Sequence, residues 1–174
     1  LLNTYGVTYL SLGLFDRAVE SLTQALAIRQ TTLPHHHPDT LKSMRDLTLA
    51  LFRTGQYDRA ETLGREAIEA HIDRYGNQHA DTLNTQEYQA IIYRNQGKLE
   101  QATTLQRQII QGQTQLLGPH HPDTLATQSN LALCLQDLEQ YNEAEQLCQM
   151  VADTETQTLG PSHPRTLSAQ NNLA

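Results

Sequence analysis

Apolar residues recur along the chain with the three-to-four-residue spacing of helices, and the two-residue alternation of a strand does not occur. The clearest stretch follows Pro122, where apolar positions fall at i, i+4 and i+7: Leu131, Leu135, Leu138. A second stripe follows after the short turn Glu139–Gln140: Ala144, Leu147, Cys148, Val151. The pattern predicts one helix opening at Pro122 and a second helix from about residue 141 to residue 158.

This pair of predicted helices returns every 42 residues along the whole sequence. The most visible repeated element is a five-residue block, HPDTL, HADTL, HPDTL or HPRTL, which begins at His37, His79, His121, His163. A small-residue column keeps the same spacing without a gap: Ala18, Ala60, Ala102, Ala144. Such columns predict one array of about nine helices, with repeats at about 1–36, 37–78, 79–120 and 121–162 and a partial repeat at 163–174.

The local signals at the helix ends agree with this division. Proline and aspartate, each present in three of the four histidine blocks, suit the first turn of a helix, where a missing N–H is no loss and negative charge is favourable. Glycine at Gly13, Gly55 and Gly97 supplies the left-handed residue that ends a first helix, and Glu139 breaks that series. We expect the alanine column to mark the crossing of two closely packed helices.

The repeat resembles the tetratricopeptide repeat (TPR) family: a small residue at Ala132, a bulky one at Leu135, and Ala144 followed by Leu147. Its 42-residue period, with LG-x-x-HPDTL joints and an NLA-x-x-L core, is similar to the kinesin light chain repeats and to arrays in NLR-like signalling ATPases. Four sites depart from the pattern: Ala80 for proline, Arg165 for aspartate, Glu139 for glycine, and Tyr88–Gln89–Ala90 for Asn-Leu-Ala.

The resemblance implies an all-α fold, a right-handed superhelical solenoid of antiparallel helix pairs. The first helix of each pair would line a concave groove that binds peptides or partner proteins. It also implies a module with no catalytic activity of its own.

Composition narrows the classes of function. The 174 residues are 38% hydrophobic, 5% aromatic and 18% charged, which suits an elongated fold with little interior per residue. The net charge of −7 argues against nucleic acid, RNA included, and against anionic membranes as partners. No apolar run is long enough to span a bilayer. The two cysteines, Cys134 and Cys148, lack metal or redox spacing and favour a reducing, cytoplasmic environment.

The histidines are the most suggestive candidate chemistry, and we interpret them as structural. His37, His79, His121 and His163 each open a helix one repeat apart, too far to share an ion, so capping and joint packing are expected. The run His35–His37 could bind metal adventitiously. Neither cysteine has a histidine base nearby, and carboxylates two apart on a helix do not face each other. We therefore expect no enzyme, no cofactor and no metal site.

By the geometry that the resemblance implies, the groove is the informative surface. We expect it to be lined by Asn3, Val7, Lys42, Arg45, Leu49, Phe52, Arg53, Asn84, Tyr88, Ile91, Arg94, Asn95, Ser129, Asn130, Leu133 and Asn171. One column is apolar throughout, and amides flank it that can both donate to and accept from a peptide backbone. The cations favour a peptide with acidic residues beside an apolar anchor. The open alternative is that these residues only solvate and pack a scaffold.

A second hypothesis is architectural. The chain would be a sensor or spacer segment of a larger NLR-like signalling protein, docking on neighbouring domains or self-associating end to end. It rests on the expectation that both ends fall within first helices and lack the polar capping repeats that solenoids need.

Overall fold

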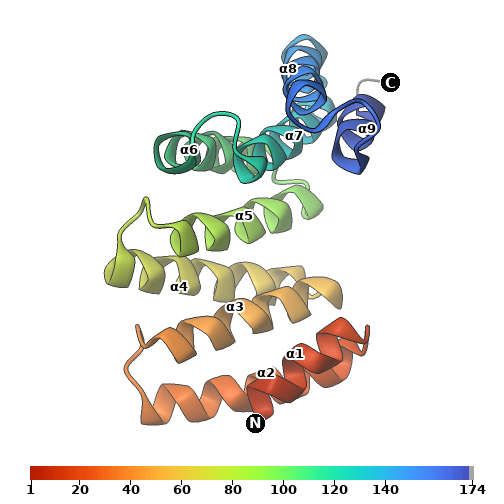
Figure 1. Cartoon of the computed structure of the whole chain (residues 1–174). Coiled ribbons are helices and arrows are strands. Elements are labelled where there is room, and N and C mark those ends of the chain that lie inside the picture. Colours follow the sequence, from red (N-terminus) through yellow and green to blue (C-terminus); the bar gives the residue numbers. More distant parts are fainter. Residues whose placement is uncertain (173–174) are drawn as a thin grey trace. The chain divides into compact units, whose positions relative to one another are not determined.

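The structure, a computed structural model, describes residues 1–172, and this part of the chain is all-helical, with nine α-helices and no strand. The chain divides into two compact units, Leu1–Gln96 and Gly97–Ala174. Leu173 and Ala174, the last two residues of the expected partial repeat, lie outside the described residues. The helices of unit 1 are α1 (Leu2–Ser11), α2 (Phe15–Thr32), α3 (Pro38–Arg53), α4 (Tyr57–Tyr75) and α5 (Ala80–Asn95) (Figure 1). Those of unit 2 are α6 (Leu99–Leu117), α7 (Pro122–Asp137), α8 (Tyr141–Leu159) and α9 (Pro164–Asn171).

In unit 1 each helix packs against the next one in the sequence, as the helix-pair prediction requires (Figure 1). One apolar cluster joins α2, α3, α4 and α5, with Leu22, Met44, Ala60 and Ile92 at most 1% exposed. The alanines expected at the crossing of each pair, Ala18, Ala60, Ala102 and Ala144, are at most 1% exposed. A side chain in place of Gly6 on α1 would collide with Leu22 on α2, so these two helices approach closely.

Unit 2 repeats the arrangement, with α6 against α7, α7 against α8 and α8 against α9. Leu131, Leu135 and Ala144 form the core of the α7–α8 pair, and Ile110 and Leu147 pack on its edge. The predicted stripes therefore become the buried faces. Helix α8 runs one residue beyond the expected end.

The repeated histidine blocks are helix starts, and the capping prediction is confirmed. In each block Nδ1 of the histidine accepts a hydrogen bond of 3.2 Å from the backbone N–H two residues later. The threonine is fully buried, and its hydroxyl donates to the backbone carbonyl oxygen six residues earlier, at Pro34, Gly76, Gly118 or Gly160. One five-residue block thus provides an acceptor for an N–H at the helix N-terminus and a donor for a carbonyl oxygen of the preceding loop.

The turn that joins the first and second helix of each pair shows why glycine recurs there. Gly13 and Gly55 have φ of 74° and 73°, and the next residue donates its N–H to the carbonyl five residues back, closing a Schellman motif. Glu139 holds the same left-handed conformation, with φ of 61°. The sequence departure therefore does not change the backbone, and Glu139 carries the conformational cost of a side chain there.

Candidate functional site

The first helices of unit 1, α1, α3 and α5, lie side by side, with α1 in contact with α3 and α3 in contact with α5. We call their shared surface the first-helix face, defined by the predicted residues Asn3, Val7, Lys42, Arg45, Leu49, Phe52, Arg53, Asn84, Tyr88, Ile91, Arg94 and Asn95. Each of these twelve residues lies on one of the three helices. The structure thus places the predicted residues of this unit on adjacent helices.

An apolar row crosses the first-helix face of unit 1. Val7 is 39% exposed, while Leu49 and Ile91 are half-buried one helix further along each time. Tyr88, one turn before Ile91 on α5, is 36% exposed. Because apolar area left in water favours contact with another apolar surface, this row is the part of the face best suited to an anchor side chain.

The side-chain amide of Asn3 is buried, whereas an amide that binds a peptide in a groove would have to be exposed. It is 7% exposed, and its Nδ2 donates to Oδ2 of Asp46 at 3.0 Å. Its Oδ1 accepts from Ser43 Oγ at 2.7 Å and from Arg29 Nη1 at 3.0 Å. The amide therefore joins α1, α2 and α3, and its hydrogen-bonding groups are already engaged within the fold.

The charge on α3 is more balanced than the cations alone suggest. Arg45 Nη2 lies 3.5 Å from Oδ1 of Asp46, whose side chain is 11% exposed, whereas Arg45 is 38% exposed. Lys42 is exposed one turn earlier. The positive groups available to a ligand on α3 are therefore the outer part of Arg45 and the Lys42 ammonium group, with a buried carboxylate behind them.

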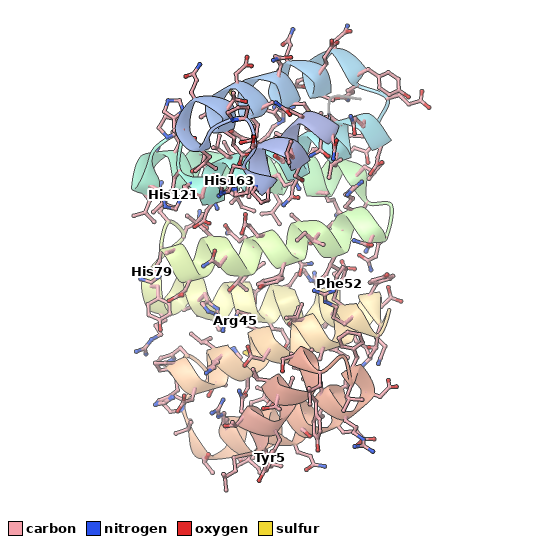
Figure 2. All side chains as sticks on the ribbon, turned by 45° about the vertical axis from the view of Figure 1, so that its right-hand side comes forward. Tyr5, Arg45, Phe52, His79, His121 and His163 are labelled. Carbon is pink, nitrogen blue, oxygen red and sulfur yellow. The ribbon has the colours of Figure 1, made fainter. Side chains whose placement is uncertain are left out.

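At the C-terminal end of α3, one predicted residue packs on the core and the next is exposed at the surface. The Phe52 ring lies 5.7 Å from the Tyr57 ring and packs on the core of unit 1. Arg53 is exposed and lines a surface hollow of about 500 Å³ with Arg17 and the turn that begins at Gly13. Figure 2 shows Arg45 and Phe52 arising from the same helix, with His79 at the start of α5.

On α5, Asn84 and Asn95 are exposed, and Arg94 is half-buried. Asn95 Nδ2 donates to the carbonyl oxygen of Ile91 at 2.8 Å, so one of its donors is used within its own helix. Asn84 thus presents an exposed amide close in sequence to the exposed ring of Tyr88.

Unit 2 carries the remaining predicted residues on its own first helices. Ser129, Asn130 and Leu133 are half-buried on α7, and Asn171 is exposed at the end of α9. Ser129 Oγ donates to the carbonyl oxygen of Leu125 at 3.1 Å. Leu133 repeats in unit 2 the apolar position that Val7, Leu49 and Ile91 hold in unit 1.

Sequence reasoning missed the residues of the second helices that lie behind this surface. Arg29 on α2 donates to Asn3, to Ser43 Oγ at 2.6 Å and to the Asp39 carbonyl oxygen at 2.7 Å. The signal was available in the repeat register, because the residues equivalent to Arg29 are also polar in every repeat: His71, Gln113 and Glu155.

The other candidate chemistries have structural explanations. In the described residues, no group of three or more His, Cys, Asp or Glu side chains is placed to hold a metal ion. Cys134 and Cys148 are both buried, and burial raises the pKa of the Cys148 thiol, which makes it a poorer nucleophile. Within residues 1–172, no helix combines the length and the apolar character that crossing a membrane requires.

The chain is similar to known proteins in both sequence and structure. A family model of the tetratricopeptide repeat matches residues 1–73, 80–147 and 123–174. A Podosopora anserina protein described as a kinesin light chain with nearly identical TPR-like repeats is 30% identical, with a TM-score of 0.88 over 99% of this chain and 82% of that chain. A second structure of it gives a TM-score of 0.89, at 30% identity, over 99% and 81% of the two chains. BtubC (BKLC) from P. vanneervenii, 18% identical over 94% of this chain and 65% of that chain, is similar in fold, with a TM-score of 0.84. No curated protein matches the chain.

Proposed function

Because this chain belongs to the tetratricopeptide repeat family, in general a protein–protein interaction module, we propose that it binds a peptide or partner protein on its first-helix face. The observation that carries the proposal is the apolar row of Val7, Leu49 and Ile91 on three adjacent helices, extended by the exposed ring of Tyr88. Four repeats and a partial fifth would form one continuous array for this purpose.

The ligand that this face favours is a peptide with an apolar anchor and acidic neighbours. The row would hold one or two anchor side chains, since buried apolar anchors dominate binding energy at protein interfaces. Lys42 and the exposed part of Arg45 lie one to two turns before Leu49 on α3, within reach of a carboxylate beside the anchor. The exposed amide of Asn84 would bind the peptide backbone.

The test begins with a peptide array that varies the anchor and the flanking charge, followed by titration calorimetry of the best peptide. Arg45→Glu and Arg94→Glu are expected to weaken binding and to flatten its dependence on salt. Val7→Lys tests the apolar row. Arg65→Glu is the matched control, because Arg65 is exposed on the second helix α4, away from the first-helix face. Unchanged affinity in the two arginine variants would contradict the proposed electrostatic contribution to binding. Unchanged affinity in Val7→Lys would contradict the proposed anchor site.

A second candidate function is architectural self-association within a larger signalling protein. It is favoured by a different observation, the apolar side chains exposed on second helices, such as Leu116 on α6 and Met150 on α8, which are 50% and 42% exposed. Such a role would use the array as a spacer that docks on neighbouring domains.

A further inference from the structure

A hollow of about 460 Å³ lies along α3 and α4 of unit 1, and none of its lining residues belongs to the first-helix face. Leu47 and Leu51 of α3 and Leu63 of α4 give it an apolar wall. Asp58 and Glu66 of α4 also line it, and both side chains are exposed. The hollow, which we call the α3–α4 hollow, therefore combines apolar surface with two carboxylates.

The negative charge of the α3–α4 hollow is not neutralised from within unit 1. Glu66 has no hydrogen-bond or ion-pair partner in the part of the chain that the structure describes. Asp58 Oδ1 accepts a hydrogen bond of 3.1 Å from Gln96 Nε2, which is an uncharged donor. Arg59 also lines the hollow, but its Nη1 donates to Oε1 of Gln56 in the turn before α4. Both carboxylates thus keep their charge for a ligand.

The internal repeat shows that this combination belongs to the second repeat in particular. The position of Leu51 is tyrosine in the first and third repeats, at Tyr9 and Tyr93, which are both half-buried. A tyrosine ring reaches further from the helix than leucine, so the shorter side chain leaves more space beside α3. The position of Glu66 is uncharged in the other three repeats: Gln24, Gln108, Met150.

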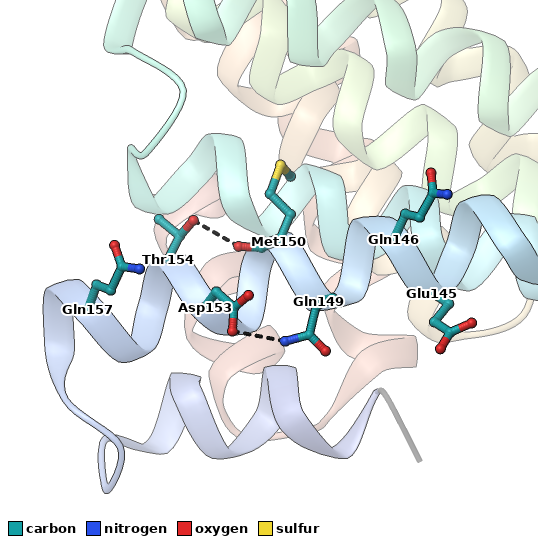
Figure 3. Close-up of a pocket in the computed structure, with 7 residues that line it drawn as sticks. All are labelled: Glu145, Gln146, Gln149, Met150, Asp153, Thr154 and Gln157. Atoms are coloured by element: carbon teal, nitrogen blue, oxygen red, sulfur yellow. Dashed lines mark hydrogen bonds between the residues drawn. The ribbon is translucent and has the colours of Figure 1, made fainter.

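The hollow of about 580 Å³ on α8 has similar charge but different walls (Figure 3). Glu145 and Asp153 line it with the same spacing of eight residues, and Asp153 Oδ1 accepts from Gln149 Nε2 at 2.8 Å. Its lining residues all belong to α8, and Met150 is the apolar member among them. This hollow can attract cations, but it offers little apolar area to an anchor side chain.

The spacing of the two carboxylates favours a helical ligand. Asp58 and Glu66 are separated by about 12 Å along α4, at 1.5 Å per residue. On a second helix lying along α4, residues i and i+7 share one side about 10 Å apart, with i+3 and i+4 between them. A helix pairs its own backbone groups, whereas an extended segment would turn unpaired N–H and C=O groups towards the leucines.

We propose that the α3–α4 hollow binds an amphipathic helix of a partner protein. Its apolar side chains would contact the three leucines, and two cationic residues would pair with Asp58 and Glu66. The leucine contacts supply most of the affinity, while the exposed ion pairs fix the register and select the charge. Because this chain carries a net charge of −7, a basic partner is favoured over a second copy. The site does not depend on peptide binding at the first-helix face.

A designed helix tests the proposal against the whole chain. The probe is an alanine-based helical peptide with arginine at i and i+7 and leucine at i+3 and i+4, followed by fluorescence anisotropy. Saturable binding of one peptide per chain is expected. Glu66→Lys should weaken it by roughly tenfold or more, because like charges then meet. Thr62→Tyr should also weaken it, since the exposed Thr62 lines the hollow and a ring there occupies the space.

Two matched variants keep the result specific to this site. Glu145→Lys makes the same charge change at an exposed carboxylate of the α8 hollow and should leave the affinity unchanged. Val7→Lys, which tests the first-helix face, should leave it unchanged as well. Circular dichroism verifies that each variant is folded.

Three results would overturn the proposal. The first is the absence of saturable binding to the natural chain. The second is an equal loss in Glu66→Lys and Glu145→Lys, because net charge alone would then attract the peptide. The third is a loss in Val7→Lys, which would place the probe on the first-helix face. A probe with glutamate in place of both arginines should bind at least about tenfold more weakly, and equal binding would contradict the two ion pairs.

Discussion

Glu155 and Arg165 form a short ion pair across the joint between α8 and α9, with Oε1 and Nη2 2.9 Å apart. Glu155 is 5% exposed, and the same arginine nitrogen donates to the carbonyl oxygen of Pro122 at 2.9 Å. Three repeats earlier, the equivalent positions hold Arg29 and Asp39, 3.8 Å apart. The signs of the charges are exchanged while the pairing is kept, which accounts for arginine in the place of the usual aspartate.

Exchanging one partner of this pair should destabilise the joint, and exchanging both should restore it. Arg165→Asp places two carboxylates together and is expected to cost about 1–3 kcal/mol, less than for a fully buried pair because Arg165 is 37% exposed. The double variant Glu155→Arg with Arg165→Asp recreates the pair of the first joint and should recover most of that loss. Denaturant unfolding and amide exchange in α9 measure both. Additive losses in the double variant would show that the two side chains are not coupled.

Gln89 is expected to be a weak point in the core of unit 1. It is 1% exposed, and neither its Oε1 nor its Nε2 has a hydrogen-bond partner. Because the equivalent residues are Leu47 and Leu131, Gln89→Leu should raise the free energy of unfolding by about 1–2 kcal/mol. Gln86→Leu is the matched control, since Gln86 Nε2 does donate to Asn77 Oδ1 at 3.0 Å, and there stability should fall. Equal effects in the two variants would contradict the interpretation.

Gly64 on α4 leaves the space that the side chain of Gln89 on α5 occupies. A side chain in place of Gly64 would collide with Oε1 of Gln89. Gly64→Ala is therefore expected to cost about 1–3 kcal/mol through overpacking, and a smaller amount when Gln89→Ala is present to make room. Thermal unfolding of the two single variants and the double variant gives the coupling energy. A coupling energy of zero would show that the two positions affect stability independently of each other.

His71 should make stability depend on pH below neutrality. Its ring is 5% exposed, its Nδ1 donates to the carbonyl oxygen of Ala67 at 2.8 Å, and burial lowers its pKa from 6.5. The unfolded chain takes up the proton first as pH falls through about 6.5, so folding loses stability from that point downward until the folded histidine is protonated as well. His71→Gln, the residue at the equivalent position 113, should flatten this part of the curve.

The control for this prediction is His35→Gln, because His35 is exposed in the loop before α3. That substitution should leave the pH dependence as it is in the natural chain. The relevant measurement is the difference between the unfolding free energies of variant and natural chain at several pH values. A constant difference for His71→Gln from pH 5 to 8 would exclude the buried ring as the cause.

Replacing Glu139 by glycine should stabilise the turn between α7 and α8. The left-handed φ of 61° costs a residue with a side chain about 1 kcal/mol relative to glycine, part of which is offset by the greater freedom of glycine in the unfolded chain. Gly55→Glu is the reciprocal change, at φ of 73°, and should lower the midpoint of thermal unfolding. A loss of stability in Glu139→Gly would mean that contacts of the glutamate outweigh its backbone cost.

The repeat sequence predicted the helix pairs and their order, and for one pair it predicted a first helix from Pro122 and a second helix from about residue 141 to residue 158; the structure confirms these predictions, with α8 one residue longer. It also predicted that the histidines cap helices. These features depend on interactions within a few residues, such as the bond from the Asp123 N–H to His121 Nδ1, and a local pattern is enough to specify them.

What only the tertiary structure decided is the environment of residues that share one repeat position. Tyr5 and Leu47 are equivalent in sequence, yet one is 55% exposed and the other 4%, because burial depends on a helix supplied by another repeat. The amide of Asn3 is likewise engaged by Arg29, Ser43 and Asp46, which lie on two other helices. A periodic sequence specifies each unit and its local caps, whereas contacts between units depend on which side chains meet after stacking.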